Sequence, residues 1–212
     1  MLVVASLISA ALGLTRFART GHGLYIFLIW NLFLAWIPFV YAFIAYGLHR
    51  SRFRNGFFIG GCGMIWLLFL PNAPYLLTDL IHLRVENNYL FWYDLLTLLW
   101  FAWTGLLLGF ASLYLMHQIV AETFGQWIGW AFAVVTLGLT GFGVYLGRFL
   151  RWNSWDVVRD PLSLFADIYH LFRHPFANFY DHVFWLVLAA FLICVYVTLT
   201  TLTPLHHERR AN

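Results

Sequence analysis

The chain contains no lysine, and only 10% of its 212 residues are charged. Soluble domains average about 25% charged and roughly 45–50% apolar residues, whereas 62% of the residues here are hydrophobic. This composition excludes a water-soluble fold, because a chain of this length cannot hide so much apolar surface. The formal net charge is +3 without a long basic run, so nucleic acid is not an expected partner.

Cysteine is also scarce. Cys62 and Cys194 are the two cysteines, and both lie inside apolar stretches. They exclude a disulfide framework and give little support to a cysteine metal site. Aromatic residues are abundant instead, at 21% with 11 tryptophans, which suits side chains at the surfaces of a bilayer.

The apolar stretches predict an all-α fold, a polytopic transmembrane helical bundle of about six segments in a single integral membrane domain over 1–212. The predicted segments are 2–17, 24–47, 57–70, 95–117, 127–147 and 183–203. A full span needs about 20 residues, so the first stretch either crosses the membrane or lies at its surface. It lacks the basic leader of a secretory signal, which favours a membrane segment.

An interfacial helix is predicted over 161–173, between the last two segments. Asp160 is suited to cap its start and Pro161 to occupy its first position. Apolar side chains then recur at helical spacing, which is typical of an amphipathic helix on a membrane surface: Leu162, Phe165, Ile168, Tyr169 and Phe172.

The third segment runs into two prolines, Pro71 and Pro74, which predict a broken helix whose freed backbone faces protein or water. With six spans, the polar connections 71–94 and 147–182 fall on the same side of the membrane. The arginines at 50–54 and in the tail favour the cytoplasm for the opposite side, although the total arginine count does not.

Candidate catalytic residues are Asp79, His82 and Asp94. Asp79 and His82 are three residues apart, so they share one face of a helical turn. Ionisable groups at the ends of membrane helices are costly unless hydrated or paired, which makes them functional candidates. Alternatively, Asp79 and His82 satisfy the backbone of the broken helix, and Asp94 caps the next span.

Candidate substrate-binding residues are Arg148, Arg151, Asn153 and Asp156. The two arginines are expected on one helical face at a membrane boundary, where guanidinium groups suit an anionic headgroup. The alternative is pairing with nearby aspartates or contact with general lipid headgroups.

Candidate metal ligands are His82, His170 and His174. His170 and His174 are four residues apart and are suited to bind one divalent metal such as zinc from one helix face. They are equally typical of ordinary residues at a membrane surface.

Three stretches carry a resemblance to a known family: PNAPYLLTDLIHL, the WYD at 92–94, and GRFLRWNSWDVVRDP. The chain is similar there to bacterial membrane proteins catalogued as a domain of unknown function, from about the second segment onward. The resemblance implies a membrane fold and no reaction. It marks as signature positions Pro71, Asn72, Pro74, Tyr75, Asp79, His82, Asp94, Arg148, Trp152, Asn153, Trp155 and Asp156.

The favoured function is a metal-dependent membrane hydrolase acting on a lipid-like substrate. Alternatives are a non-enzymatic subunit or assembly factor of a membrane complex, and a small transporter. The expected partners are the lipid bilayer and either a lipid-like substrate or another membrane protein, and the expected location is the bacterial cytoplasmic (inner) membrane.

Overall fold

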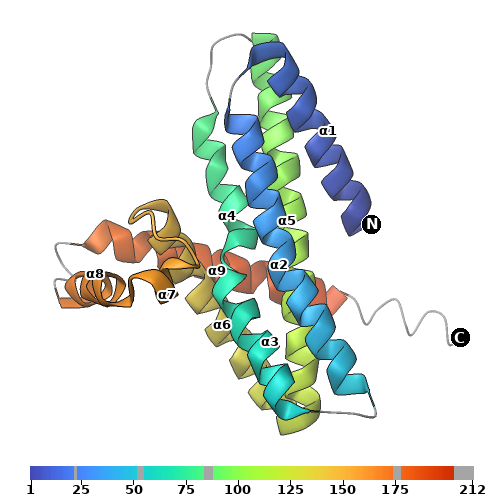
Figure 1. The fold of residues 1–212 in the computed structure, drawn as a ribbon, viewed down its shortest axis with the longest axis vertical. Coiled ribbons are helices and arrows are strands. Elements are labelled where there is room, and N and C mark those ends of the chain that lie inside the picture. The colour runs from blue at the N-terminus through green and yellow to red at the C-terminus, as the bar shows by residue number, and fades with distance from the viewer. Residues whose placement is uncertain (22, 52–54, 84–87, 174–177, 203–212) are drawn as a thin grey trace, which may run out of the picture. The chain divides into compact units, whose positions relative to one another are not determined.

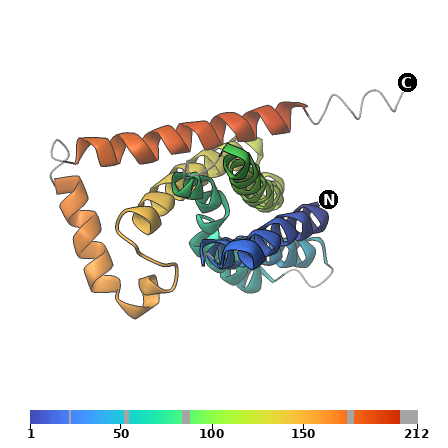
Figure 2. The same ribbon diagram turned by 90° about the horizontal axis from the view of Figure 1, so that it is seen from above.

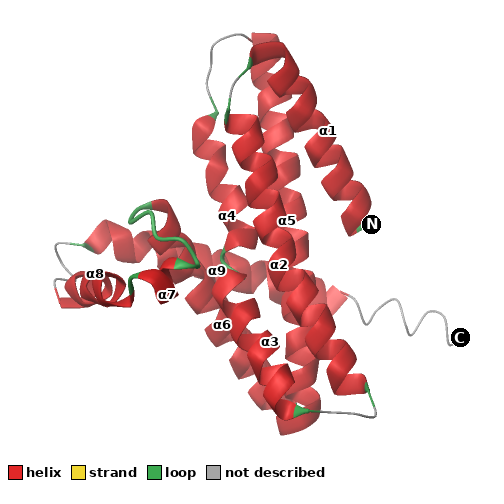
Figure 3. Ribbon diagram, viewed as in Figure 1, coloured by secondary structure: helices red, strands yellow, loops and turns green. Residues whose placement is uncertain are grey.

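A computed structural model describes residues 1–21, 23–51, 55–83, 88–173 and 178–202. Throughout these ranges the chain forms helices joined by short connections, and they contain no strand (Figure 3). The predicted all-α fold class is therefore confirmed. Arg84, His174, residues 52–54 of the arginine cluster and the tail 203–212 lie outside the described residues.

Six helical stretches are long and apolar enough to cross a membrane, as predicted: Leu2–Arg19, Leu24–Arg50, Gly56–His82, Leu90–Phe124, Gln126–Arg148 and Phe179–Leu202. The third and fourth differ most from the sequence prediction. The third continues past the prolines to His82 rather than ending at 70, and the fourth begins earlier than 95. Length and composition thus indicate an integral membrane protein.

The chain divides into two compact units, Met1–Trp130 and Ala131–Asn212. A single domain over 1–212 stays a prediction. In the first unit, α2 packs against α1, α3, α4 and α5. Its elements are α1 (Leu2–Thr20), α2 (Leu24–Arg50), α3 (Gly56–Phe69), α4 (Asn72–Thr78), the 3₁₀ turn η1 (Asp79–His82) and α5 (Asn88–Phe124) (Figure 1).

The helix break between α3 and α4 is placed by Pro71, which has no N–H to donate to the preceding turn. The Asn72 side chain donates a hydrogen bond of 3.0 Å to the carbonyl oxygen of Phe69. This contact satisfies one of the carbonyls that the end of α3 leaves free. The predicted broken helix is present, and its second half leads directly into η1.

Close packing of α4 on α5 depends on Gly105. A Cβ atom there would overlap the carbonyl oxygen of Ala73 and lie 2.8 Å from Leu76 Cδ1. Ala73 and Leu76 are fully buried beside Phe101 in the core of this unit. The small residue lets the two backbones approach, and this contact fixes α4 and therefore η1.

The second unit contains most of α6 (Gln126–Arg148), together with α7 (Asp156–Arg159), α8 (Pro161–Arg173) and α9 (Phe179–Leu202). Helices α6 and α9 pack through aromatic rings, with the Phe142 and Trp185 centroids 5.7 Å apart. Gly141 lies against the Trp185 carbonyl oxygen, where a Cβ atom would be only 2.8 Å away. Figure 2 shows that α8 runs in a clearly different direction from α9.

Helix α8 begins as predicted, at Pro161, and the Ser163 N–H donates to the Asp160 carboxylate at 3.3 Å. Its apolar arc differs from the prediction, because Ile168 belongs to the half that packs on the protein, with the buried Leu164 and Leu171. The other half is an exposed stripe, hereafter the α8 stripe, made of Leu162, Phe165, Tyr169 and Phe172, and at its end Phe172 also packs against the Phe142 and His182 rings. An uncovered apolar stripe is what a membrane-surface helix presents to lipid.

Candidate functional site

Asp79 and His82 lie at the two ends of η1, and the structure brings their side chains together. The Nε2 atom of His82 is 4.0 Å from Oδ1 of Asp79. The Asp79 side chain is completely buried, whereas 41% of the His82 side chain is exposed. The pair therefore combines a carboxylate sealed inside the bundle with an imidazole that outside molecules can reach.

Asn31 is a partner of Asp79 that the sequence analysis did not identify. Its side-chain amide donates to Oδ2 of Asp79 at 3.2 Å, inside the bundle. Asn31 lies in the middle of a long apolar run on α2, and a polar residue there is the signal that marks an interhelical contact. The amide and the packed α4 together hold the carboxylate in one orientation.

Asp94 lies in a separate polar cluster. Its carboxylate accepts from Arg16 Nε at 2.6 Å and Nη2 at 2.8 Å, and from the Tyr25 hydroxyl at 2.7 Å. Tyr25 and Asn31 are six residues apart on α2, so the two clusters are separated by about 9 Å along that helix. Helix α5 begins at Asn88, so Asp94 is not the helix cap considered as its alternative role. Its catalytic role stays a prediction.

The connector between α6 and α7, residues 149–155, corrects one expectation. Arg148 ends α6, and Arg151 adopts a left-handed backbone conformation with φ of 60°. The two arginines therefore do not share one helical face, because the helix has already ended and the chain has turned between them. Arg148 is half-buried and Arg151 is exposed.

Asn153 and Asp156 bind each other across one turn. Oδ2 of Asp156 accepts from the Asn153 backbone N–H at 2.8 Å and from its side-chain amide at 3.1 Å. Farther along, the Trp152 indole N–H donates to Oδ2 of Asp167 on α8 at 2.9 Å. These contacts hold the connector against the start of α8, so Asn153 acts within the fold of the loop.

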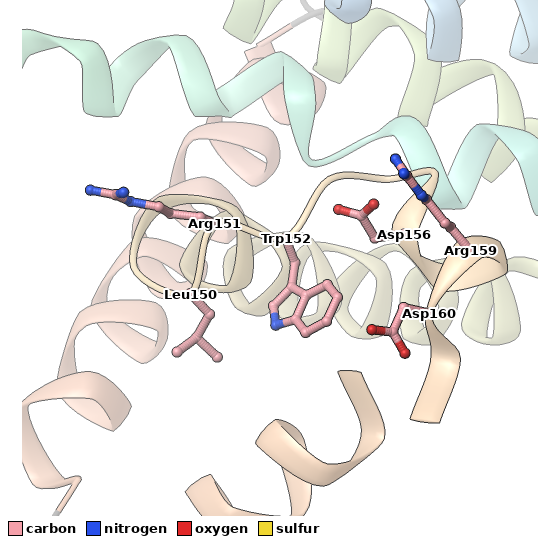
Figure 4. A pocket seen from close by; sticks show the side chains of 6 residues that line it. All are labelled: Leu150, Arg151, Trp152, Asp156, Arg159 and Asp160. Carbon is pink, nitrogen blue, oxygen red and sulfur yellow. The ribbon is translucent and has the colours of Figure 1, made fainter. Parts of the chain in front are cut away.

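A pocket of about 480 Å³ opens beside this connector, lined by Leu150, Arg151, Trp152, Asp156, Arg159 and Asp160. In Figure 4 the Trp152 indole lies between Leu150 and Asp160, and the Arg151 side chain extends away from the carboxylates. Two of the four predicted substrate-binding residues therefore line it. Arg159 and Asp160 were missed, since no spacing rule connects them to Arg151.

Metal ligation by His82, His170 and His174 stays a prediction. His170 is exposed on α8, in a different unit from His82, and His174 lies outside the described residues. Within the described ranges, no three His, Cys, Asp or Glu side chains are grouped around a point that a metal ion could occupy. Asp79 and His82 supply two suitable donors, so further ligands would be required.

Comparison with known proteins places the chain in a family. A family model with the description "Protein of unknown function (DUF1361)" matches residues 30–201. The chain belongs to this family. The matched range contains Asp79, His82 and the whole connector pocket. No curated protein and no solved structure matches the chain.

The resemblance to a family of unknown function is thereby confirmed. Membership in DUF1361 assigns no reaction. The signature positions of the sequence analysis and the meeting of its two polar connections at one membrane face stay predictions.

Proposed function

We propose that the protein is a membrane-embedded hydrolase that acts on an ester or amide of a lipid-like substrate, with Asp79 and His82 as its reactive pair. The observation that supports this is the buried carboxylate 4.0 Å from a partly exposed imidazole. A carboxylate beside histidine orients the ring and stabilises its protonated form. Catalytic contacts are often long before substrate binds.

In this proposal His82 takes a proton from a water molecule that attacks the substrate carbonyl, and later returns it to the leaving group. The Asp79 carboxyl group keeps the ring in place, while Asn31 holds Asp79. A divalent metal such as zinc, if bound through His82, would lower the pKa of the attacking water. We propose the bacterial cytoplasmic membrane as the location, supported by the resemblance of the motifs to bacterial membrane proteins.

The test uses purified protein reconstituted in vesicles of mixed phospholipids and N-acyl lipids, with released fatty acid as the readout. His82→Gln is expected to lower the rate by about 10²–10⁴-fold, the usual contribution of a general base. Asp79→Asn should lower it as well. His49→Gln is the matched control, because His49 pairs with Glu122 and not with Asp79. This variant should leave the rate unchanged.

Metal content measured on the same preparations decides how the water is activated. About one bound ion per chain, lost in His82→Ala, would support the metal-dependent form. Loss of activity in His82→Gln without bound metal would support His82 as the base alone. If wild type and His82→Gln, both folded, release fatty acid equally or not at all, the hydrolase proposal is wrong.

A small transporter is the second candidate, because one observation favours it. The third candidate span contains both the helix break and the fully buried Asp79. Broken helices with a buried acidic group are a recurring arrangement at transport sites. Proton-driven uptake of a solute into vesicles, lost in the Asp79→Asn variant and not accompanied by lipid hydrolysis, would support the transporter. The subunit or assembly factor stays a prediction from the sequence.

A further inference from the structure

The connector pocket has a charge arrangement that selects among lipid headgroups. Two carboxylates and two guanidinium groups line it, so its formal charge sums to zero. An anionic ligand would meet Asp156 and Asp160, and a cationic ligand would meet Arg151 and Arg159. A ligand that carries both charges can satisfy both kinds of group, because unpaired charges that lose water are costly.

The charges are also separated in space. In Figure 4 the Arg151 side chain extends away from Trp152, whereas Asp156, Asp160 and Arg159 lie on the other side of the indole. One side thus carries a single positive charge and the other a net negative charge. Arginine suits a phosphate group, and carboxylates beside an indole face suit an ammonium group.

The α8 stripe indicates that the ligand arrives in lipid form. It begins at Leu162, two residues after the pocket residue Asp160, and Leu162 is 82% exposed. Val158, between the pocket residues Asp156 and Arg159, is 81% exposed. Apolar side chains this bare belong in the acyl region of a membrane. The pocket is therefore expected at headgroup depth.

From these observations we propose that the connector pocket binds the zwitterionic headgroup of phosphatidylethanolamine. The long Arg151 side chain turns inward to hold the phosphate, and Asp156 and Asp160 accept hydrogen bonds from the primary ammonium beside Trp152. Ethanolamine fits better than choline, because a quaternary ammonium has no N–H to donate to the carboxylates. The volume of about 480 Å³ lies within the usual size of ligand pockets, roughly 300–1,000 Å³.

The experiment titrates the full-length protein in mild detergent with phosphatidylethanolamine, phosphatidylcholine or phosphatidylglycerol, and measures the bound fraction by native mass spectrometry. Wild type is expected to bind phosphatidylethanolamine at least about tenfold more tightly than the other two. The other two lipids lack the ammonium N–H groups, and the loss of a hydrogen bond to a charged carboxylate weakens binding by about this factor or more. Equal affinities, or tightest binding of the anionic phosphatidylglycerol, would overturn the proposal.

Two variants test the two charged sides of the pocket separately. Arg151→Gln should weaken binding of phosphatidylethanolamine and of phosphatidylglycerol about tenfold, since both lose the contact to phosphate. Asp160→Asn keeps a capping side chain for α8 but should weaken phosphatidylethanolamine and strengthen phosphatidylglycerol. Arg173→Gln is the matched control, because Arg173 is exposed on α8 and contacts Tyr169 outside the pocket.

An equal loss in Arg151→Gln and Arg173→Gln would overturn the proposal, as would an Asp160→Asn variant that weakens all lipids alike. Soluble glycerophosphoethanolamine distinguishes the source of the ligand. It should compete only at concentrations well above the lipid. If glycerophosphoethanolamine does not compete at any concentration, the acyl chains alone bind. If it binds as tightly as the lipid, the ligand is a soluble molecule. Either result would overturn the proposal of a lipid headgroup site. Binding is measured without turnover, so this outcome is separate from the Asp79–His82 proposal.

Discussion

Charged side chains in the first unit join helices that are far apart in the sequence, whereas those of the connector in the second unit contact near neighbours. Arg16 and Asp94 are 78 residues apart, and Arg50 and Glu122 are 72 apart. In the connector, Asn153 and Asp156 are only three residues apart. Similar residue types therefore do different work: the first set holds helices together, and the second shapes a loop that leaves charges on its surface.

Burial explains the difference. Arg16 and Asp94 retain 11% and 16% of their side-chain exposure, so each would be an uncompensated charge inside the bundle without the other. Arg151 and Arg159 are exposed, so water can solvate their guanidinium groups. Charges that are already hydrated can exchange water for a ligand at modest cost, which makes the connector the better place for a binding site.

The largest expected effect follows from breaking the Arg16–Asp94 pair. Arg16→Gln should lower the free energy of unfolding by about 3–5 kcal/mol, because it leaves the Asp94 carboxylate buried without its countercharge. Unfolding by SDS in mixed micelles measures this. Arg19→Gln, which removes an exposed arginine from the same helix, is the matched control and should change little.

The double variant Arg16→Gln with Asp94→Asn tests whether the loss comes from the pair itself. It removes both charges and leaves polar groups that still form hydrogen bonds, so part of the lost stability should return. A double variant no more stable than Arg16→Gln alone would show that the two side chains are not coupled, and the contrast between the two regions would lose its basis.

A smaller effect is expected at Gly105, where the first unit positions η1. Gly105→Ala should cost about 1–3 kcal/mol of unfolding free energy, because the added methyl group overpacks the contact with Ala73 and Leu76. Gly60→Ala is the control, since no heavy atom lies within 4 Å of its added Cβ. Equal stability of the two variants would contradict close α4–α5 packing.

Features that depend on local spacing could be predicted from the sequence. The six apolar runs predicted the spans, Pro71 predicted the helix break, and Asp160 with Pro161 predicted the start of α8. The approach of Asp79 and His82 also follows from spacing, since residues three apart meet on one turn. Each of these depends on neighbours within one or two turns of the chain.

Contacts between distant elements could not be predicted in this way. Nothing near Arg16 indicates Asp94 as its partner, and a helix start at Asn88 placed Asp94 inside α5 rather than at its cap. The left-handed Arg151 separated two arginines whose spacing suited one helical face. The grouping of Arg159 and Asp160 with Trp152 likewise arises from the path of the connector.

The smallest effect is expected at Glu122. This residue allows an exposed ion pair to be compared with the buried Arg16–Asp94 pair within the first unit. Its carboxylate accepts from Arg50 at 2.6 Å and contacts His49 at 3.1 Å, so its shortest contact equals the 2.6 Å between Arg16 and Asp94. It is 34% exposed, however, and Arg50 is 57% exposed. Glu122→Gln should therefore cost at most about 1 kcal/mol, and less at high salt, because water and ions already screen the pair.

Measuring SDS unfolding of Glu122→Gln and Arg16→Gln at low and high salt separates geometry from burial. If burial decides, the Arg16 effect stays several times larger and changes little with salt, while the Glu122 effect shrinks. If the two losses are similar, short distances alone set the strength of these pairs. A well-aligned carboxylate would then hold an exposed arginine of the connector as strongly as Asp94 holds Arg16. Exposure alone would no longer indicate that these arginines are available to a ligand.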